Sequence, residues 1–258
     1  MNGLFITGTD TDTGKTLVTL VIMQALQQNG IAVSGMKPVA AGIEIASELG
    51  SVKSRDRAMS AARQVKTNAD ALAIQQQSSV TPEYSTVNPY LFDPPIAPHI
   101  AAQQADVKIT SQPILQAYQQ LRENVDCVVV EGAGGWLVPL NDDPSDHQLD
   151  IADLPVLLGL PVVLVVGLKL GCINHARLSY EAIRQKGCRF AGWISSQVDA
   201  GMTNVDANID ALAHYLGPCL GNIPFLEIDR NNILENAVQS VRYIDTDALY
   251  KVITDDEK

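Results

Sequence analysis

The segment LFITGTDTDTGKT, residues 4–16, combines glycines, a lysine and a hydroxyl in a pattern suited to phosphate binding. Apolar residues followed by Gly8 predict a buried strand that ends in a loop. Beyond Gly14, Lys15 and Thr16, the apolar spacing predicts a buried helix. Backbone N–H groups of such a loop bind phosphate oxygens, while the lysine adds a positive charge and the threonine hydroxyl binds Mg²⁺. The segment therefore predicts a nucleoside triphosphate site.

The loop differs from the general phosphate-loop pattern in its spacing and its charge. Five residues, not four, separate Gly8 from Gly14, so Thr9 stands where the first glycine is expected. Asp10 and Asp12 place carboxylates beside a phosphate site. We expect them to need a cationic partner: the loop lysine, a magnesium ion or an amine on the substrate. The alternative is an ordinary strand–turn–helix unit with a capping threonine or aspartate.

Two further charged residues lie at the ends of predicted strands. Lys37 ends the strand that begins at residue 31, and Glu131 ends the apolar strand 126–131 before a glycine-rich turn. Ligands gather outside the carboxyl ends of parallel strands, so we expect Lys37 and Glu131 beside the phosphate loop, with Glu131 placed to hold Mg²⁺. An exposed surface lysine is the alternative for Lys37. Asp70 lies in the first turn of a predicted helix, where it either stabilises the helix N-terminus or faces the nucleotide.

Strands and helices alternate along the rest of the chain, which is typical of a parallel sheet. We expect one domain over residues 1–258, an α/β, P-loop NTPase-like fold with a mostly parallel sheet and helices on both faces. Residues 40–68 are expected to form a surface helix or loop, and the proline-rich residues 80–99 an irregular pocket wall that ends at His99, a packing or capping residue. Further strands are predicted over 161–166, 190–198 and 222–224, and helices over 17–28, 111–123, 150–154, 173–186, 204–216 and 245–253.

Composition narrows the classes of partner. The 258 residues carry a net charge of −11, which argues against nucleic acid or an anionic membrane as the main partner. Four cysteines are scattered without paired C-x-x-C spacing, so we expect reduced thiols in a cytoplasmic protein rather than a zinc site or a disulfide framework. The N-terminal residues do not match a secretory signal. The apolar stretch 154–168 is interrupted by two prolines and is too short to span a bilayer.

Several motifs, present in the family's order, resemble those of the dethiobiotin synthetase family. The similarity covers most of the chain, and the five-residue spacing of the phosphate loop looks like the family's own spacing. The motifs are TGTDTDTGKT at 7–16, GMKPVAAG at 35–42, ADALA at 69–73, TVNPY at 86–90, PHIAA at 98–102, VVEGAGGW at 129–136, GLKLGCINHA at 167–176, AGW at 191–193 and GNIP at 221–224.

The resemblance implies a homodimeric ligase that uses ATP and Mg²⁺ to join CO₂ and 7,8-diaminopelargonate into the cyclic urea dethiobiotin, a step of biotin biosynthesis. One amine captures CO₂ as a carbamate, the γ-phosphoryl group moves to it to give a carbamic-phosphoric anhydride, and the second amine closes the ring. ADP and phosphate are released. Lys15 and Lys37 are implied as the catalytic residues, since they offset negative charge on phosphate and carbamate.

The resemblance also implies three sets of binding residues. The implied magnesium ligands are Thr16, Asp70 and Glu131. The implied nucleotide-binding residues are Asp12, Thr13, Gly14, Lys15, Thr16, Leu17, Asp70, Glu131, Gly132, Ala133, Gly134, Ser196, Gln197 and Pro224. The implied substrate-binding residues are Thr11, Lys37, Ala41, Gly171, Cys172, Ile173 and Asn174, of which the last four resemble a helix start that receives the substrate carboxylate, supplied from the neighbouring subunit.

Two positions depart from the family pattern. Ala41 replaces a serine that often contacts the substrate, and the loss of such a hydroxyl contact costs about 0.5–1.5 kcal/mol. Ser196 stands where the family has an adenine-recognising asparagine, so we expect weaker base recognition, or recognition through Gln197 and the backbone near Pro224. The stretch 43–66 is longer than usual.

Other nucleotide-dependent classes fit the sequence less well. A switch or partition ATPase carries an additional lysine early in the loop, where this chain has Thr9 and Asp10. A glutamine-dependent amide-forming synthetase needs a glutaminase domain, for which no residues remain, and a GTPase needs an N-K-x-D motif that the chain lacks. A degenerate, non-catalytic relative is the hardest alternative to dismiss, although Lys15, Thr16 and Lys37 are all present.

Overall fold

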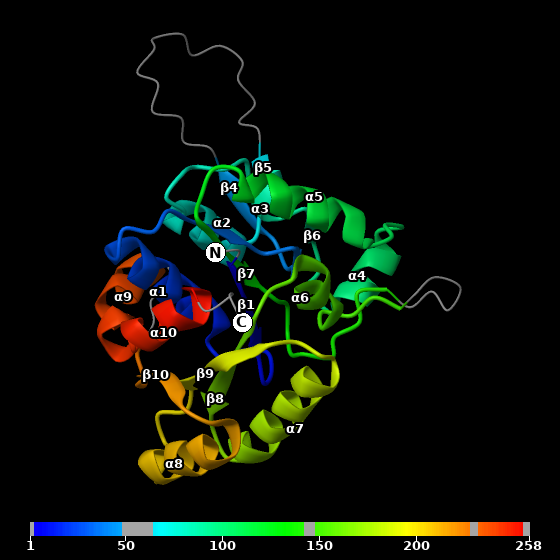
Figure 1. The fold of residues 1–258 in the computed structure, drawn as a ribbon. Helices are drawn as coiled ribbons and strands as arrows, with labels where there is room; N and C mark the ends of the chain where they lie inside the picture. The colour runs from blue at the N-terminus through cyan, green and yellow to red at the C-terminus, as the bar shows by residue number, and fades with distance from the viewer. Residues whose placement is uncertain (1–2, 48–63, 142–147, 228–231, 255–258) are drawn as a thin grey trace.

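A six-stranded parallel sheet forms the centre of the molecule (Figure 1). The structure is a computed structural model that describes residues 3–47, 64–141, 148–227 and 232–254. The strand order is β10-β9-β8-β1-β7-β2, which places the strand before the phosphate loop between β7 and β8. The strands are β1 (Gly3–Gly8), β2 (Val33–Met36), β7 (Cys127–Glu131), β8 (Val162–Leu168), β9 (Phe190–Gln197) and β10 (Cys219–Ile223).

Helices cover both faces of this sheet, as the sequence predicts. Alternate residues of β1 enter different cores, because Leu4 and Ile6 pack on one face and Phe5 on the other. One face carries α1 (Lys15–Gln28), α2 (Ala69–Gln77), α9 (Ile233–Ser240) and α10 (Thr246–Thr254). The other carries α5 (Ser111–Arg122), α6 (Asp153–Leu158), α7 (Cys172–Gln185) and α8 (Val205–Leu216).

The helix after the phosphate loop is apolar around most of its circumference. Its residues from Leu17 to Met23 are all buried, because α1 lies between the sheet and the outer helices α2 and α9. The helix ends at Asn29 and Gly30, where the positive φ of 79° favours glycine. Burial on all sides anchors the loop-bearing end of this helix to the core.

Two small sheets lie beside the main one, and one of them includes a strand from residues 80–99, where an irregular segment is predicted. This segment is not simply irregular: it forms α3 (Tyr84–Val87) and β6 (Tyr90–Phe92), and α4 (Pro98–Gln104) begins within it. Its prolines fall in turns and at the first position of α4, where a missing N–H costs no hydrogen bond. β6 pairs in parallel with β3 (Val39–Ala41).

Residues 40–68 are expected to form a surface helix or loop. Two strands near the ends of this stretch pair with each other in antiparallel orientation. β4 (Glu44–Ser47) pairs with β5 (Gln64–Thr67), so the expectation of a surface helix or loop is wrong for these strands. Residues 48–63 lie outside the described ranges.

One further predicted helix begins later than expected, and another helix is not predicted at all. The helix expected over 150–154 begins at Asp153, because Asp150 forms a bridge to Pro139 and donates its N–H to the Asp153 carboxylate. The helix α9 was not predicted, and a 3₁₀ turn, η2 (Val241–Tyr243), follows it. In the ranges that the structure describes, no helix has both the length and the apolar character needed to cross a bilayer.

Candidate active site

The phosphate loop connects β1 to α1 and is packed against the end of β8. Thr9 donates its backbone N–H to Val165 at 3.0 Å, and a Cβ at Gly167 would lie 3.0 Å from the Thr13 side chain. Gly14 precedes α1 with φ at +82°, a conformation that other residues adopt only with strain. The loop thus presents the free N–H groups of α1 at the carboxyl edge of the sheet, as a phosphate site requires.

The loop lysine is buried, and among the described residues no carboxylate forms an ion pair with it. Lys15 is 7% exposed, and its Nζ donates to the backbone carbonyl of Asp10 at 2.7 Å. Burial lowers the pKa of Lys15 to about 8, against a weaker opposing effect of the Glu131 charge. A poorly compensated buried cation favours an anionic ligand, so the electrostatics of this loop suit phosphate.

Sheet register brings Lys37 and Glu131 together. Met36 of β2 pairs with Val130 of β7, so the next residue on each strand, Lys37 and Glu131, leaves the sheet side by side. The Lys37 Nζ donates to Glu131 Oε1 and, at 3.0 Å, to Asp70 Oδ2. The Thr16 hydroxyl donates to the same Glu131 oxygen at 3.1 Å. Four residues from four separated segments therefore meet at one point beside the phosphate loop.

The lysine and one of the two carboxylates of this cluster are buried. Lys37 is 6% exposed and Glu131 is fully buried, whereas Asp70 is partly exposed. Burial alone would lower the pKa of Lys37, but the carboxylates of Glu131 and Asp70 outweigh burial and raise it. Lys37 is therefore protonated at neutral pH, and its charge is available to a ligand that enters the site.

The donor set of the cluster fits a magnesium ion. Thr16, Asp70 and Glu131 supply hydroxyl and carboxylate oxygens, the ligands that Mg²⁺ prefers. The second oxygen of Glu131, Oε2, is buried and has no hydrogen-bond partner among the described residues. Among the residues that the structure describes, no group of three His, Cys, Asp or Glu side chains could hold a metal ion by itself.

The glycine-rich turn after β7 packs against the phosphate loop. Gly132 donates its N–H to Ile6 at 2.9 Å, and a Cβ at Gly134 would lie 3.8 Å from the Thr11 hydroxyl. Ala133 lies between these glycines and packs partly on the core. The turn and Thr11 therefore lie together, as their predicted roles in nucleotide and substrate binding require.

The pairing of β9 with β10 brings together the residues predicted to recognise the adenine base. Ser196 pairs with Ile223, and the Gln197 side chain accepts the N–H of Phe225 at 3.4 Å, next to Pro224. A Cβ at Gly14 would lie 2.5 Å from the Ser196 hydroxyl, so Ser196 lies directly against the phosphate loop.

The remaining predicted residues lie further from the lysine cluster. Ala41 ends β3, and the adjacent Gly42 carbonyl accepts the Asn68 amide at 2.9 Å. Gly171 precedes α7 with φ at +93°, and Ile173 and Asn174 line a groove of about 620 Å³ with Leu170, Arg177, Leu178, Glu181 and Asn208. The side chains of Cys172 and Leu17 are buried, so only their backbone groups can face a ligand.

Lys169, which the sequence analysis did not single out, supplies the cation that the acidic loop needs. Its Nζ lies 3.2 Å from Asp10 Oδ2, and this contact, with the N–H of Thr11, lowers the pKa of Asp10. The prediction of a cationic partner therefore holds for Asp10, but the partner comes from the β8–α7 turn. Asp12 is exposed with φ at +55°.

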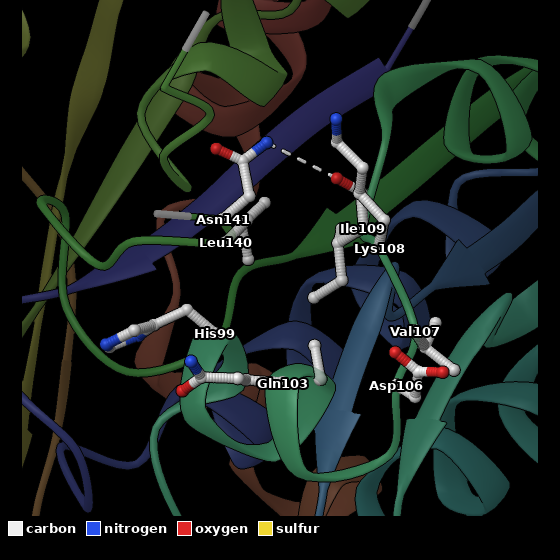
Figure 2. Close-up of a pocket in the computed structure, with 9 residues that line it drawn as sticks. His99, Gln103, Asp106, Val107, Lys108, Ile109, Leu140 and Asn141 are labelled. Carbon is white, nitrogen blue, oxygen red and sulfur yellow. Dashed lines mark hydrogen bonds between the residues drawn. The ribbon is translucent and has the colours of Figure 1, made fainter. Parts of the chain in front are cut away.

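A second hollow lies at α4. Figure 2 shows His99 and Gln103 of α4 around this hollow with Lys108, Ile109, Leu140 and Asn141. Its lining contains none of the predicted site residues. His99 does not cap the helix, because the N-cap is Ala97, so the predicted capping role of His99 is wrong and His99 lines the hollow instead.

Comparison with known proteins gives the same class of fold and one family of relatives. A family model described as an AAA domain matches residues 2–231. The chain is 44% identical over 222 residues to the ATP-dependent dethiobiotin synthetase BioD of Xanthomonas oryzae, covering 86% of this chain and 90% of the relative. It is 44% identical over 237 residues to the protein of that name from Chromohalobacter salexigens, covering 88% and 91%.

Solved structures with low sequence identity share the fold. The MinD cell division protein of Aquifex aeolicus superposes with a TM-score of 0.52 at 15% identity, covering 98% of this chain and 95% of that chain. At this level of sequence identity, the likeness concerns the fold alone.

Proposed function

The chain belongs to the ATP-dependent dethiobiotin synthetase family, and we propose that it carboxylates and cyclises 7,8-diaminopelargonate to dethiobiotin. It is an ATP-dependent ligase of biotin biosynthesis. The observation that carries the detailed proposal is the meeting of Lys37, Thr16, Asp70 and Glu131 beside the phosphate loop. A protonated lysine and oxygen ligands beside a phosphate loop are what phosphoryl transfer would need, and this supports the proposal.

The proposed reaction has three steps. One substrate amine attacks CO₂, forming a C–N bond and releasing a proton to give a carbamate. A carbamate oxygen attacks the γ-phosphorus of ATP, and ADP leaves, which yields a carbamic-phosphoric anhydride. The second amine then attacks the carbonyl carbon, the C–O bond to phosphate breaks, and phosphate and a proton are released.

The two buried lysines have different parts in this proposal. Lys15 lies within the loop that holds the triphosphate, and bound phosphate would compensate its buried charge. Lys37 is protonated and faces the point where carbamate and γ-phosphate would meet, so it stabilises charge that develops during transfer. Carbamate formation needs a neutral amine, and Thr11 and the β3 end at Ala41 are the proposed contacts for the diamine.

Magnesium is proposed at Thr16, Asp70 and Glu131, with ATP as co-substrate. When bound, Mg²⁺ would neutralise phosphate charge. The chain's own residues provide the rest: Thr16 and Glu131 share a hydrogen bond that fixes the ligand oxygens relative to α1. Asp70 reaches the same point from the first turn of α2.

We further propose that two copies of the chain form the working enzyme. The groove at the start of α7 contains the residues assigned to the substrate carboxylate, and its rim is apolar: Leu170 is 98% exposed and Leu178 is 63% exposed. Exposed leucines at a groove with polar residues are typical of an interface with another chain. A second copy covering this face would bring Gly171 to Asn174 to the substrate of its neighbour.

The first experiment measures phosphate release from ATP with Mg²⁺ and bicarbonate, with and without 7,8-diaminopelargonate, and identifies the product by mass. Release that depends on the diamine and yields dethiobiotin supports the proposal. Release without the diamine would instead favour a switch ATPase of the same fold. No release with any addition would indicate a non-catalytic relative or a different acceptor.

Replacement of the buried lysine tests its role in phosphoryl transfer. We expect Lys37→Gln to lower turnover by at least about 100-fold, while ATP affinity measured by calorimetry stays within about threefold. The same change at Lys186, which follows α7 and pairs with Asp153 at the start of α6, is the matched control and leaves turnover unchanged. Normal dethiobiotin formation by Lys37→Gln would remove Lys37 from the mechanism.

Glu131→Ala tests the proposed metal ligand. We expect the magnesium concentration at half-maximal turnover to rise by about tenfold or more, because one of two carboxylate ligands is lost. Asp126→Ala, at the opposite end of the same strand, is the control. An unchanged Mg²⁺ titration for Glu131→Ala would contradict its role as a ligand.

The double substitution Leu170→Asp and Leu178→Asp tests the proposed dimer. We expect the variant to sediment as a monomer and to lose most of its turnover, because charged residues replace the apolar rim. Val238→Asp, on α9 across the sheet, changes a half-exposed apolar residue outside the proposed interface and should alter neither property. A monomeric wild-type chain with full activity would contradict the shared site.

A further inference from the structure

A buried asparagine holds the backbone of the proposed catalytic lysine. Asn88 is 4% exposed, and its side-chain amide donates to the Lys37 carbonyl at 2.7 Å and to the Tyr90 carbonyl at 3.0 Å. The Lys37 N–H in turn donates to the Val87 carbonyl at 2.9 Å. Both polar backbone groups of Lys37 are therefore bound to the segment that contains α3. The position of Lys37 depends on where that segment lies.

The same segment reaches the helix that carries the second site carboxylate. The hydroxyl of Tyr84, on α3, accepts the backbone N–H of Asn68 at 2.8 Å and lies 3.3 Å from Asn88 Oδ1, to which it donates. Asn68 is the N-cap of α2: its Oδ1 accepts the Ala71 N–H at 3.2 Å. Asp70 lies within this capped first turn.

One hydroxyl thus joins two parts of the proposed active site. We propose that Tyr84 is a positioning residue, which bridges Asn88 and the start of α2 and thereby holds Lys37 and Asp70 where the Lys37 ammonium contacts both Asp70 and Glu131. The inference deepens the proposed function and rests on it for the catalytic meaning of Lys37.

The hydroxyl is suited to this bridge because it both donates and accepts. Asn68 offers an N–H and Asn88 offers a carbonyl oxygen, so each partner needs a different half of the hydroxyl. Burial raises the pKa of Tyr84, and the hydroxyl therefore keeps the proton that it donates. A phenylalanine has the same ring but leaves both partners without this contact.

The Tyr84 bridge also bears on the contacts between the Lys37 ammonium and its two carboxylates. Lys37 directly follows β2, whereas Asp70 lies in α2. The main chain connects the two residues only through positions 38–69. The α2 helix packs against β2 and α3, which also contact each other. Figure 1 shows α2 and α3 next to each other. Without the bridge, small shifts between these elements would change the contact of the Lys37 ammonium with its two carboxylates.

The test compares Tyr84→Phe with Tyr90→Phe. Both variants lose one phenol hydroxyl from the same segment, but the Tyr90 hydroxyl accepts the Thr110 N–H at 3.1 Å, away from Lys37 and Asp70. We expect turnover of Tyr84→Phe to fall about tenfold with little change in the KM for ATP, and that of Tyr90→Phe to stay close to wild type. Melting temperatures of both variants show whether stability differs between them.

Hydrogen exchange gives a readout that does not need the reaction. In Tyr84→Phe we expect faster exchange at Asn68 and in peptides with Lys37, and no such change in Tyr90→Phe. Normal turnover and exchange in Tyr84→Phe, or equal losses in both variants, would overturn the bridge. If the wild-type chain makes no dethiobiotin, the proposed function fails, and the exchange result still decides whether Tyr84 holds Lys37 and Asp70 together.

Discussion

The buried contact between Lys37 and Glu131 is the interaction on which the proposed active site depends. A charge in a protein interior is costly unless a partner of opposite sign lies beside it. Glu131 is fully buried at the end of a core strand, so without Lys37 or another cation its carboxylate would be destabilising there. Because burying such a pair is costly, a contribution to stability does not by itself explain why it lies here. Its position next to the phosphate loop would make this costly arrangement useful in the proposed phosphoryl transfer.

The parallel sheet places these residues through its register. β1 lies between β7 and β8, so the phosphate loop, Glu131 and Lys169 all leave the sheet at the same edge. β2 adds Lys37 next to Glu131. Residues more than 90 positions apart meet because adjacent parallel strands end together, and the same property makes the carboxyl edge of such sheets a common ligand site.

Local patterns in the sequence were sufficient to predict most of the central sheet and the placement of Lys37 and Glu131. Strand ends, glycines and apolar spacing are short-range signals, and parallel topology then implies proximity. The predictions failed where an element depends on a distant partner. β6 forms because β3 pairs with it, about 50 residues earlier, and the proline content of its segment gives no local sign of this. The Lys169 contact with Asp10 and the hydroxyl bridge of Tyr84 likewise join distant segments, so spacing alone did not reveal them.

The acidic phosphate loop is consistent with an anionic ligand once these long-range contacts are counted. The Asp10 carboxylate is paired with Lys169 and the Thr11 N–H, while its backbone carbonyl, a neutral group, holds Lys15. Lys15 has no carboxylate at contact distance among the described residues, and burial lowers its pKa more than the Glu131 charge raises it. Lys37 has the opposite setting, with two carboxylates beside it. The two buried lysines therefore differ: Lys15 lacks a carboxylate partner among the described residues and Lys37 has two. In the proposed function, the triphosphate would supply the missing negative charge beside Lys15.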